Sequence, residues 1–452
     1  MEDRQIQMAR RVAEAVAARG GRTFYVGGFV RDRLLGRENK DVDLEVHGVT
    51  PAQLEQILGT LGECVKMGAS FGVFGLRHYA IDIAMPRRES ATGRGHKDFE
   101  VFVDPFLGVE KAAQRRDFTM NALMEDVLTG EVIDSFGGVA DLKAGVIRHV
   151  NDESFAEDPL RVLRAAQFAA RFELTLAPET IALCRRMAVG ALSRERVMGE
   201  LRKALMKAQR PSIFFEALRE MKQLSGWFPE LAALIGVEQD PVHHPEGDVW
   251  AHTMRVMDAA AQLRAQAEIP QGFMLSALCH DLGKATASER INGRIHAYGH
   301  EKVGVPLAEA LVRRLTDEIK LCAYVKNMVA LHMRPNMLVA QRAGEKAYMK
   351  LFDQAISAPD LLLLAKADHQ GRSVYPPYGP YEEVLQAQLT HYRARMAAPC
   401  VRGADLAAAG LTPGPAFKTA LDLAHQLQLA GVRKEDALRQ VLAAAKNAQE
   451  KQ

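Results

Sequence analysis

Two aspartates separated by one residue stand near the start of the sequence, shortly after a pair of glycines. Asp41 and Asp43 lie in DVDLEV, and Gly27 and Gly28 lie in YVGGFVRD. Residues i and i+2 of a β-strand point to the same side, so the two carboxylates would lie close together. Close carboxylates repel each other unless a divalent cation lies between them. Oxygen ligands of this kind indicate Mg²⁺ and phosphoryl transfer.

The glycine pair offers a complementary feature. It follows a short apolar run and precedes VRDRLLG, which has the pattern of a helix. Glycines at such a junction allow backbone N–H groups to face an anion such as phosphate. A third acid, Asp82 in AIDIAM, lies on a predicted neighbouring strand and would complete a carboxylate site. Each feature has a simpler alternative, since many glycine pairs are turns and alternating acids also occur on solvent-facing strand edges.

A second set of candidate ligands lies in the C-terminal half of the chain. An adjacent His-Asp pair in CHDLGK has a histidine upstream and an aspartate far downstream. These residues are His252, His280, Asp281 and Asp368. Mixed nitrogen and oxygen donors suit a divalent transition metal. A lone histidine is more often structural than a ligand, but several in this order, with both acids, favour a metal site.

Length and composition indicate what kind of chain positions these residues. At 452 residues the chain exceeds what one hydrophobic core usually supports, so two or more domains are expected. Hydrophobic content of 48% and charged content of 25% are those of a soluble globular protein. The five cysteines show no CxxC spacing, and no apolar run of about 18 residues offers a membrane span. These features predict a cytoplasmic, multidomain enzyme with no membrane partner.

The sequence pattern changes along the chain. The first 150 residues mix helical periodicity with short β-like runs such as FYVGG and FEVFV, and a polar segment at 86–98 is predicted to be a loop. After Val150 strand signals nearly vanish, and Ala/Leu/Arg helical patterns continue to the end. The predicted fold class is therefore α+β. It has a mixed α/β head at 1–150, followed by an all-α neck at 151–225, a body at 226–375 and a tail at 376–452.

Two further motifs follow the glycines and aspartates in order. They are QRRDFTMNAL at 114–123 and EDPLRVLRAAQFAARF at 157–172. Together with GGFVRD and DVD, they resemble the class II tRNA nucleotidyltransferases, the CCA-adding enzymes, and the related bacterial poly(A) polymerases. The resemblance runs over most of the chain. It implies a polymerase-β-like head with a small sheet, template-independent addition of CCA to the 3′ end of tRNA from CTP and ATP, and a requirement for Mg²⁺.

The resemblance also implies roles for single residues. The triphosphate would be held by Gly27, Gly28, Arg31 and Asp32. Two metals would be held by Asp41 and Asp43, with Asp82 as the third acid. The ribose would be sensed by Arg116, Asp117 and Asn121. For Arg115 and Arg116, the alternative is a pair of solvated cations at the start of a helix.

The EDxxR motif predicts how nucleotides are chosen. Asp158 and Arg161 are three residues apart on a predicted helix and therefore share a face. A carboxylate accepts hydrogen bonds and a guanidinium donates them. Cytosine and adenine each present an amino donor beside a ring-nitrogen acceptor, so the pair fits both and rejects uracil and guanine. The alternative is that Asp158, which precedes Pro159, simply caps the helix.

Three other features of the resemblance bear on specificity. Arg164 is a further nucleotide-binding candidate on the same helix. Gln167 stands where many family members carry an arginine, so contacts from that charge are in doubt. The segment 86–98 matches the place of the family's flexible loop and weakly favours the full CCA reaction.

The histidine set resembles the HD superfamily of metal-dependent phosphohydrolases, so the body at 226–375 is expected to be an HD domain. In that resemblance His300 and His332 are candidates for a second metal, and Lys284 for contact with a phosphate. Some tRNA nucleotidyltransferases carry such a domain with phosphatase, 2′-nucleotidase or 2′,3′-cyclic phosphodiesterase activity. A purely structural metal, or a domain that mainly supports tRNA, is the alternative.

Rival functions remain at this point. A poly(A) polymerase or a partial CC- or A-adding enzyme would use the same chemistry, and an HD phosphohydrolase with a nucleotide- or RNA-binding head belongs to another class. Intact DVD, RRD and EDPLR motifs argue against the last. RNA is expected along a cluster of cations, for which a solvated helix face is the alternative. The cluster comprises Arg194, Arg196, Arg202, Lys203, Lys207 and Arg210.

Overall fold

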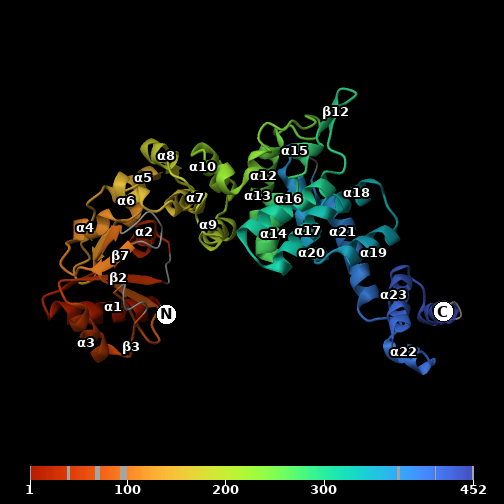
Figure 1. Cartoon of the computed structure of the whole chain (residues 1–452), viewed down its shortest axis with the longest axis horizontal. Coiled ribbons are helices and arrows are strands. Elements are labelled where there is room, and N and C mark those ends of the chain that lie inside the picture. Colours follow the sequence, from red (N-terminus) through yellow and green to blue (C-terminus); the bar gives the residue numbers. More distant parts are fainter. Residues whose placement is uncertain are drawn as a thin grey trace. The chain divides into compact units, whose positions relative to one another are not determined.

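The computed structural model describes residues 2–37, 41–66, 72–91, 99–373, 377–412 and 414–449. The chain divides into two compact units (Figure 1). The first comprises residues 1–201 and 213–226, and the second comprises 202–212 and 227–452. Each unit has its own apolar core and is described by itself.

A seven-stranded mixed sheet forms the centre of the first unit (Figure 1). Its strand order is β3 (Cys64–Lys66), β4 (Val73–Leu76), β5 (Ile81–Ala84), β2 (Val42–His47), β1 (Arg22–Val26), β8 (Met124–Asp126) and β9 (Val132–Ile133). The pairing of β2 with β5 is parallel, and the other neighbouring strands are antiparallel. The predicted head with a small mixed sheet is therefore confirmed.

Helices cover this sheet because their sequences carry apolar stripes. In α1 (Glu2–Ala17), the residues Met8, Val12 and Val16 recur at helical spacing and are buried. This helix packs on β1 and beside α3 (Pro51–Leu61), whose first turn is capped by Thr50. The short α2 (Gly28–Leu34) follows β1 directly.

The polar segment predicted as a loop at 86–98 is partly a strand, so that prediction was wrong for its first residues. β6 (Arg87–Ala91) pairs antiparallel with β7 (Phe99–Val103) in a separate two-stranded sheet. Residues 92–98 lie outside the described part of the chain. The polar composition hid the strand because only main-chain pairing is needed to form it.

The remainder of the first unit is mainly helical. Its helices are α4 (Val109–Gln114), η2 (Thr119–Asn121), α5 (Gly138–Ala144), α6 (Asp152–Ala156), α7 (Leu160–Phe172), α8 (Pro178–Cys184), α9 (Arg194–Lys207), α10 (Ser212–Glu220) and α11 (Leu224–Trp227), of which α9 and α11 continue into the second unit. A short parallel pair joins β10 (Val146–Ile147) to β11 (Thr175–Leu176). In α7, residues on nearly every side are buried, so this helix is held firmly within the unit.

The second unit is a helical assembly. It contains α12 (Pro229–Ala232), α13 (Val249–Leu263), η3 (Arg264–Gln266), α14 (Pro270–Cys279), α15 (Lys284–Ala287), α16 (His300–Leu315), α17 (Ile319–Leu331), α18 (Arg334–Ala340), α19 (Glu345–Gln354), α20 (Ala358–Gly371) and α21 (Gly379–Met396), followed by α22 (Gly403–Ala408), α23 (Pro415–Leu429) and α24 (Lys434–Gln449). Residues 272–279 of α14 are all buried, and α13, α17 and α20 pack against this helix. No helix in the described ranges has the length and apolarity needed to cross a membrane.

One hairpin interrupts the helices of the second unit. β12 (Glu289–Ile291) and β13 (Arg294–His296) pair antiparallel. They are joined by Asn292 and Gly293, whose φ angles are 48° and 82°. An Asn-Gly pair favours this tight turn, so the sequence carried a hairpin signal that the expectation of an all-α body passed over.

Candidate active site and metal centre

A pocket of about 660 Å³ in the first unit collects most of the residues predicted for nucleotide binding and catalysis. Those that line it are Gly27, Gly28, Arg31, Asp43, Asp82, Arg116, Asp117, Asn121, Asp158, Arg161 and Arg164. They come from the β1–α2 turn and α2, from β2 and β5, from η2 and the segment before it, and from α7 and the segment before it. Of the predicted set, Asp32 and Asp41 are not part of its lining.

The register of β2 and β5 sets two carboxylates side by side. Asp43 is the direct partner of Asp82 in this parallel pair. Burial, then the charges of Asp82 and Asp41, raise the pKa of Asp43 to about 6, although Arg116 opposes the shift. Because β2 lies between β1 and β5, it is not an edge strand and Asp43 is half-buried, although Asp41, one residue before β2, faces solvent. Asp43 and Asp82 are a pair of oxygen donors without nitrogen or sulfur, which fits a hard divalent cation, whereas the exposed Asp41 does not line the pocket.

Gly27 brings the backbone close to an arginine. Its φ of 61° lies in the left-handed region, and a side chain there would place Cβ 3.1 Å from Arg116 Nη1. The same nitrogen donates a hydrogen bond of 3.2 Å to the carbonyl oxygen of Asn121. A larger residue would strain the turn and displace the guanidinium. The first glycine of GGFVRD is therefore required by geometry.

A chain of buried hydrogen bonds joins the three motifs of the head. Arg31 donates to Asp32 Oδ1 at 2.7 and 2.8 Å and to Asn121 Oδ1 at 2.7 Å. Asn121 Nδ2 donates to Asp117 Oδ1 at 2.9 Å, and Arg164 Nε donates to Asp117 Oδ2 at 2.7 Å. Arg31 is only 4% exposed, so its main contribution in this state is to hold the other motifs in place.

Glu45 is a buried acid that the sequence reasoning missed. It is 1% exposed, accepts a 3.0 Å hydrogen bond from Arg116 Nη2 and lies 3.7 Å from Arg115 Nη2. Burial by itself would raise the pKa of Glu45, but the hydrogen bond with His47 and the charges of both arginines lower it to about 2. The two arginines are thus not a solvated pair. The signal was available, since Glu45 continues the alternation of Asp41 and Asp43 in DVDLEV.

The EDxxR residues already have partners. Asp158 Oδ1 accepts a 3.0 Å bond from the backbone N–H of Leu160, and Oδ2 accepts a 2.7 Å bond from Arg196 Nη2. Arg161 donates to the carbonyl oxygens of Ser154 and Arg115 at 2.6 and 2.8 Å. The structure therefore contains the helix-start contact given above as the alternative, and it also places both side chains on the pocket wall.

Six predicted ligands meet in the second unit around Asp281. His280 Nε2 lies 3.2 Å and His252 Nε2 lies 3.7 Å from Asp281 Oδ2, whereas His300 Nε2 lies 3.2 Å and His332 Nε2 lies 3.8 Å from Oδ1. Asp368 Oδ1 is 3.1 Å from His252 Nε2. The side chains form two ligand groups that share Asp281, one with His252 and His280 and the other with His300 and His332.

The histidines of this cluster are held in the tautomer that binds metal. Nδ1 of His280, His300 and His332 lies 2.7 to 2.8 Å from a backbone carbonyl oxygen three residues earlier. A carbonyl oxygen only accepts, so Nδ1 carries a proton, and Nε2 is the atom that offers a lone pair once the ring is neutral; against the effect of burial, Asp281 raises the pKa of His280 and of His300. His280 Nε2 is buried without a hydrogen-bond partner among the described residues. Burial, and then His280 and His300, lower the pKa of His332 to about 3, so it is neutral at pH 7. The site fits a divalent transition metal.

The fourth histidine of the cluster, His252, contacts a carboxylate through its Nδ1. His252 Nδ1 lies 2.8 Å from Glu246 Oε1, the oxygen that also lies 2.9 Å from His244 Nδ1. Such a contact orients a ligand histidine and strengthens it as a donor. Sequence reasoning missed Glu246, because a loop residue six positions before a helical histidine has no fixed spatial relation to it.

The comparisons with known proteins agree with both sites. Residues 23–148 match the model of the Poly A polymerase head domain, and residues 249–369 match that of the HD domain. The multifunctional CCA protein of Cupriavidus metallidurans is 40% identical over 367 residues, which cover 77% of this chain and 84% of that protein. That of Chromobacterium violaceum is 38% identical over 435 residues, 91% of this chain and 98% of that one. The chain belongs to the family of multifunctional CCA proteins.

Solved structures confirm the fold expected for a multifunctional CCA protein. The Bacillus stearothermophilus CCA-adding enzyme in complex with CTP superposes with a TM-score of 0.68 at 21% identity, with 99% of both chains covered. The Thermotoga maritima CCA-adding enzyme complexed with tRNA gives a TM-score of 0.63 at 20% identity, covering 97% of this chain and 95% of that one. The α+β prediction and the resemblance stated above are therefore confirmed.

Gln167, which stands where the resemblance stated above implies an arginine, is buried. It is 1% exposed and does not line the head pocket. Its Nε2 has no hydrogen-bond partner within the described ranges. The amide is thus enclosed in the core around α7, and contacts to a phosphate or base from this position are absent here.

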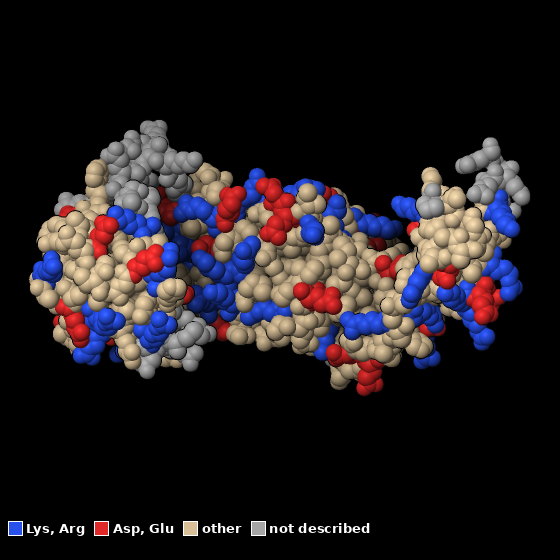
Figure 2. All heavy atoms as spheres, turned by 90° about the horizontal axis from the view of Figure 1, so that it is seen from below, with Lys and Arg blue, Asp and Glu red and all other residues tan. Residues whose placement is uncertain are grey.

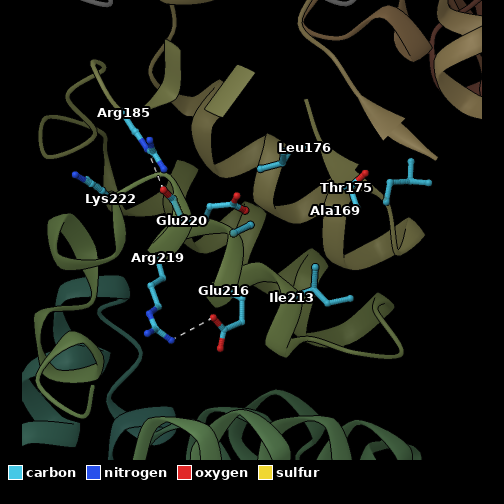
Figure 3. A pocket seen from close by; sticks show the side chains of 11 residues that line it. Ala169, Thr175, Leu176, Arg185, Ile213, Glu216, Arg219, Glu220 and Lys222 are labelled. Atoms are coloured by element: carbon cyan, nitrogen blue, oxygen red, sulfur yellow. Dashed lines mark hydrogen bonds and ion pairs between the residues drawn. The ribbon is translucent and has the colours of Figure 1, made fainter. Parts of the chain in front are cut away.

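Some of the cations that were predicted to contact RNA on the neck helices are paired with acids in the structure. Figure 2 shows Lys and Arg side chains gathered over the neck helices left of the centre of this face. Several have acidic partners on other elements, since Arg196 bonds to Asp158, and Arg210 Nε lies 3.5 Å from Asp258. A second depression, of about 690 Å³, is lined by residues of α7, β11 and α10 and by Arg185, which directly follows α8 (Figure 3). Arg185 and Lys222 are on its rim, and none of the predicted site residues lines it.

Proposed function

We propose that this protein adds C, C and A to the 3′ end of tRNA, using CTP and ATP. The observation that carries the proposal is the parallel β2–β5 register, which sets Asp43 beside Asp82 in a pocket that also holds Arg116, Asp158 and Arg161. The names of the relatives, and the CTP, ATP and tRNA complexes of CCA-adding enzymes of the same fold, support this function. A substrate tRNA also favours the predicted cytoplasmic location.

In the proposed reaction, the 3′-hydroxyl of the RNA loses its proton to solvent as its oxygen forms a bond to the α-phosphorus of the nucleotide, and pyrophosphate leaves as the bond from the α-phosphorus to the α–β bridging oxygen breaks. Asp41, Asp43 and Asp82 would hold Mg²⁺. When bound, this ion lowers the pKa of the attacking hydroxyl and neutralises charge on the leaving group. The backbone N–H of Gly28, at the start of α2, would face the triphosphate, with Arg31 and Asp32 bracing the turn, whereas the N–H of Gly27 donates to the carbonyl oxygen of Leu123.

The other head residues would choose and orient the nucleotide. We assign the ribose to Arg116, supported by Glu45 and by the chain that joins Asn121, Asp117 and Arg164. Asp158 and Arg161 would pair with cytosine or adenine after exchanging their present partners for the base. Three of those partners belong to residues that line the pocket, namely Leu160, Arg115 and Arg196, so the exchange takes place at the pocket wall.

Replacing Arg161 or Asp158 by alanine is expected to relax nucleotide choice. Incorporation of UTP relative to CTP should rise about tenfold or more, because the hydrogen bonds that reject a carbonyl and N–H edge are lost. Primer extension on tRNA ending at the discriminator nucleotide, with each triphosphate supplied alone, measures this ratio. Arg186→Ala, an exposed arginine outside the pocket, is the matched control. Slower addition with unchanged selectivity would show that both residues only cap and brace α7.

Replacing Glu45 by glutamine tests the support of Arg116. The amide keeps the shape but not the charge, so the KM for CTP is expected to rise about tenfold with a smaller change in kcat. Glu45→Ala should also lower the free energy of unfolding of the head, by about 3 kcal/mol, since it removes the buried carboxylate that pairs with the partly buried Arg116 and with His47. Steady-state kinetics and thermal unfolding measure the two effects. Glu131→Gln, whose side chain is 67% exposed, serves as the control.

The direct test of the function is extension of a tRNA that lacks its 3′ CCA, resolved to single nucleotides. Two additions with CTP alone, and a third once ATP is present, are expected. A long ladder with ATP alone would identify a poly(A) polymerase, and a stop after two cytidines would identify a CC-adding enzyme. No extension at all would assign the function to the HD domain.

We further infer that the HD domain hydrolyses phosphate esters with a divalent transition metal. The two ligand groups that share Asp281 support this second activity. So does a pocket of about 300 Å³ beside them, lined by Lys284 and Arg372. The predicted division into a head at 1–150, a neck at 151–225, an HD body at 226–375 and a tail at 376–452 remains a proposal. The family matches at 23–148 and 249–369 fall within two of these parts.

A further inference from the structure

Two stacked aromatic rings border the pocket of the HD domain. His296, the last residue of β13, and Tyr298 have ring centroids 5.0 Å apart and ring planes only 10° from parallel. Both residues line the 300 Å³ pocket that also contains Asp281 and His300. Tyr298 is 73% exposed. An aromatic ring this accessible at the wall of a pocket offers a flat apolar surface to a ligand.

The position of this pair is tied to the metal ligands. Tyr298 is two residues before His300, and Gly299 between them has a φ of 75° that turns the chain into α16. The carbonyl oxygen of Ala297 accepts a 2.7 Å hydrogen bond from His300 Nδ1. The hairpin of β12 and β13 supports His296 from the other side. The rings are thus held at a set distance from the ligand cluster.

The same pocket contains cations suited to a phosphate. Lys284 Nζ lies 2.7 Å from Asp281 Oδ2 and donates to Gln239 Oε1 at 2.8 Å, and Arg372 Nη2 lies 3.5 Å from Asp368 Oδ2. The cations, the metal ligands and the stacked rings therefore face one volume. The cations and the metal ligands account for the binding of any phosphate ester. The stacked rings strengthen binding only when the alcohol part of the ester carries a flat aromatic group.

Nucleoside phosphates are among the substrates that the family resemblance implies for an HD domain, and we propose that the Tyr298–His296 pair is the subsite that selects them, with the base stacked on this pair and the phosphate at the Asp281 cluster. This rests on the phosphohydrolase function proposed above and names the part of the substrate that the metal site does not recognise. A volume of about 300 Å³ suits one nucleotide, free or at an RNA end. Stacking uses the face of the base, so both purines and pyrimidines are accepted, with purines bound more tightly.

The test uses the full-length protein with Mn²⁺, Co²⁺ or Ni²⁺ and two esters, adenosine 2′-monophosphate and glycerol 2-phosphate, which has no base. Tyr298→Ala is expected to raise the KM for the nucleotide about tenfold, with a change of less than twofold in the KM for glycerol 2-phosphate. Tyr298→Phe keeps the ring and should restore the wild-type KM. Val242→Ala, an equally exposed apolar residue (75%) that does not line this pocket, is the control.

Each outcome decides one question. Equal effects of Tyr298→Ala on both esters, or no effect on either, would overturn the base-binding subsite while leaving phosphohydrolysis in place. If the wild type hydrolyses neither ester with any of the metals, the proposed HD function fails. Calorimetric binding of adenosine 2′-monophosphate then decides the subsite. Weaker binding by Tyr298→Ala but not by Tyr298→Phe supports it, and equal binding by all three proteins overturns it.

Discussion

Asp43→Asn is expected to lower the rate of CTP addition on the order of a thousandfold or more. The substitution keeps the size of the side chain but removes one of the three carboxylates that would hold Mg²⁺, and a loss of this size matches several kcal/mol of transition-state stabilisation. Single-turnover extension of tRNA lacking CCA measures it. Hydrolysis of adenosine 2′-monophosphate by the HD domain should be unchanged in the same preparation, because its ligands lie in the other unit.

The unfolding midpoint of Asp43→Asn distinguishes a loss of catalysis from a loss of folding. The pKa of Asp43 is raised to about 6 in the folded protein, so the folded state favours the protonated carboxyl, and this contribution to stability is lost as pH rises through 6. At pH 8 with a chelator present, asparagine removes the repulsion from Asp82. The unfolding midpoint of the head should then equal or exceed that of the wild type, and the difference should vanish near pH 4. A lower midpoint at pH 8 would attribute the lost activity to misfolding.

The second large effect is expected at Asp281. Asp281→Asn should abolish phosphohydrolysis, again by on the order of a thousandfold, because both ligand groups share this carboxylate. Metal retained after dialysis, measured by elemental analysis, should fall at the same time. Addition of C, C and A to tRNA should stay within about twofold of the wild type. Asp422→Asn, on the exposed side of α23, is the matched control.

Equal loss of both activities in either variant would contradict two separate active sites. A milder result is also informative. If Asp281→Asn keeps the metal but loses hydrolysis, one ligand group suffices for binding and the shared carboxylate acts in the reaction itself. The buried Lys284 loses its carboxylate partner in this variant, so a lower unfolding midpoint of the second unit is expected as well.

The sequence by itself determined which residues carry the chemistry. Asp41 and Asp43 alternate at the start of a strand, EDPLR starts a helix, and the His-Asp pair directly follows an apolar helix. Spacing of this kind is local, because strand and helix periodicity put side chains on one face whatever the rest of the fold does. The mixed head, the helical remainder and both ligand sets were therefore predicted. The hairpin at β12–β13 was predictable too, from its Asn-Gly turn.

Tertiary structure decided what each of these residues faces. The parallel register with β5 brings Asp82 to Asp43, packing turns Gln167 into the core, and a loop carries Glu246 to His252. The strand at 87–91 forms because residues 99–103 lie opposite it. Such contacts depend on segments far apart in the chain, and burial and pairing are set only once those segments pack. For this reason the supports of both sites, and the exposed ring of Tyr298 beside the metal ligands, became visible only in the folded protein.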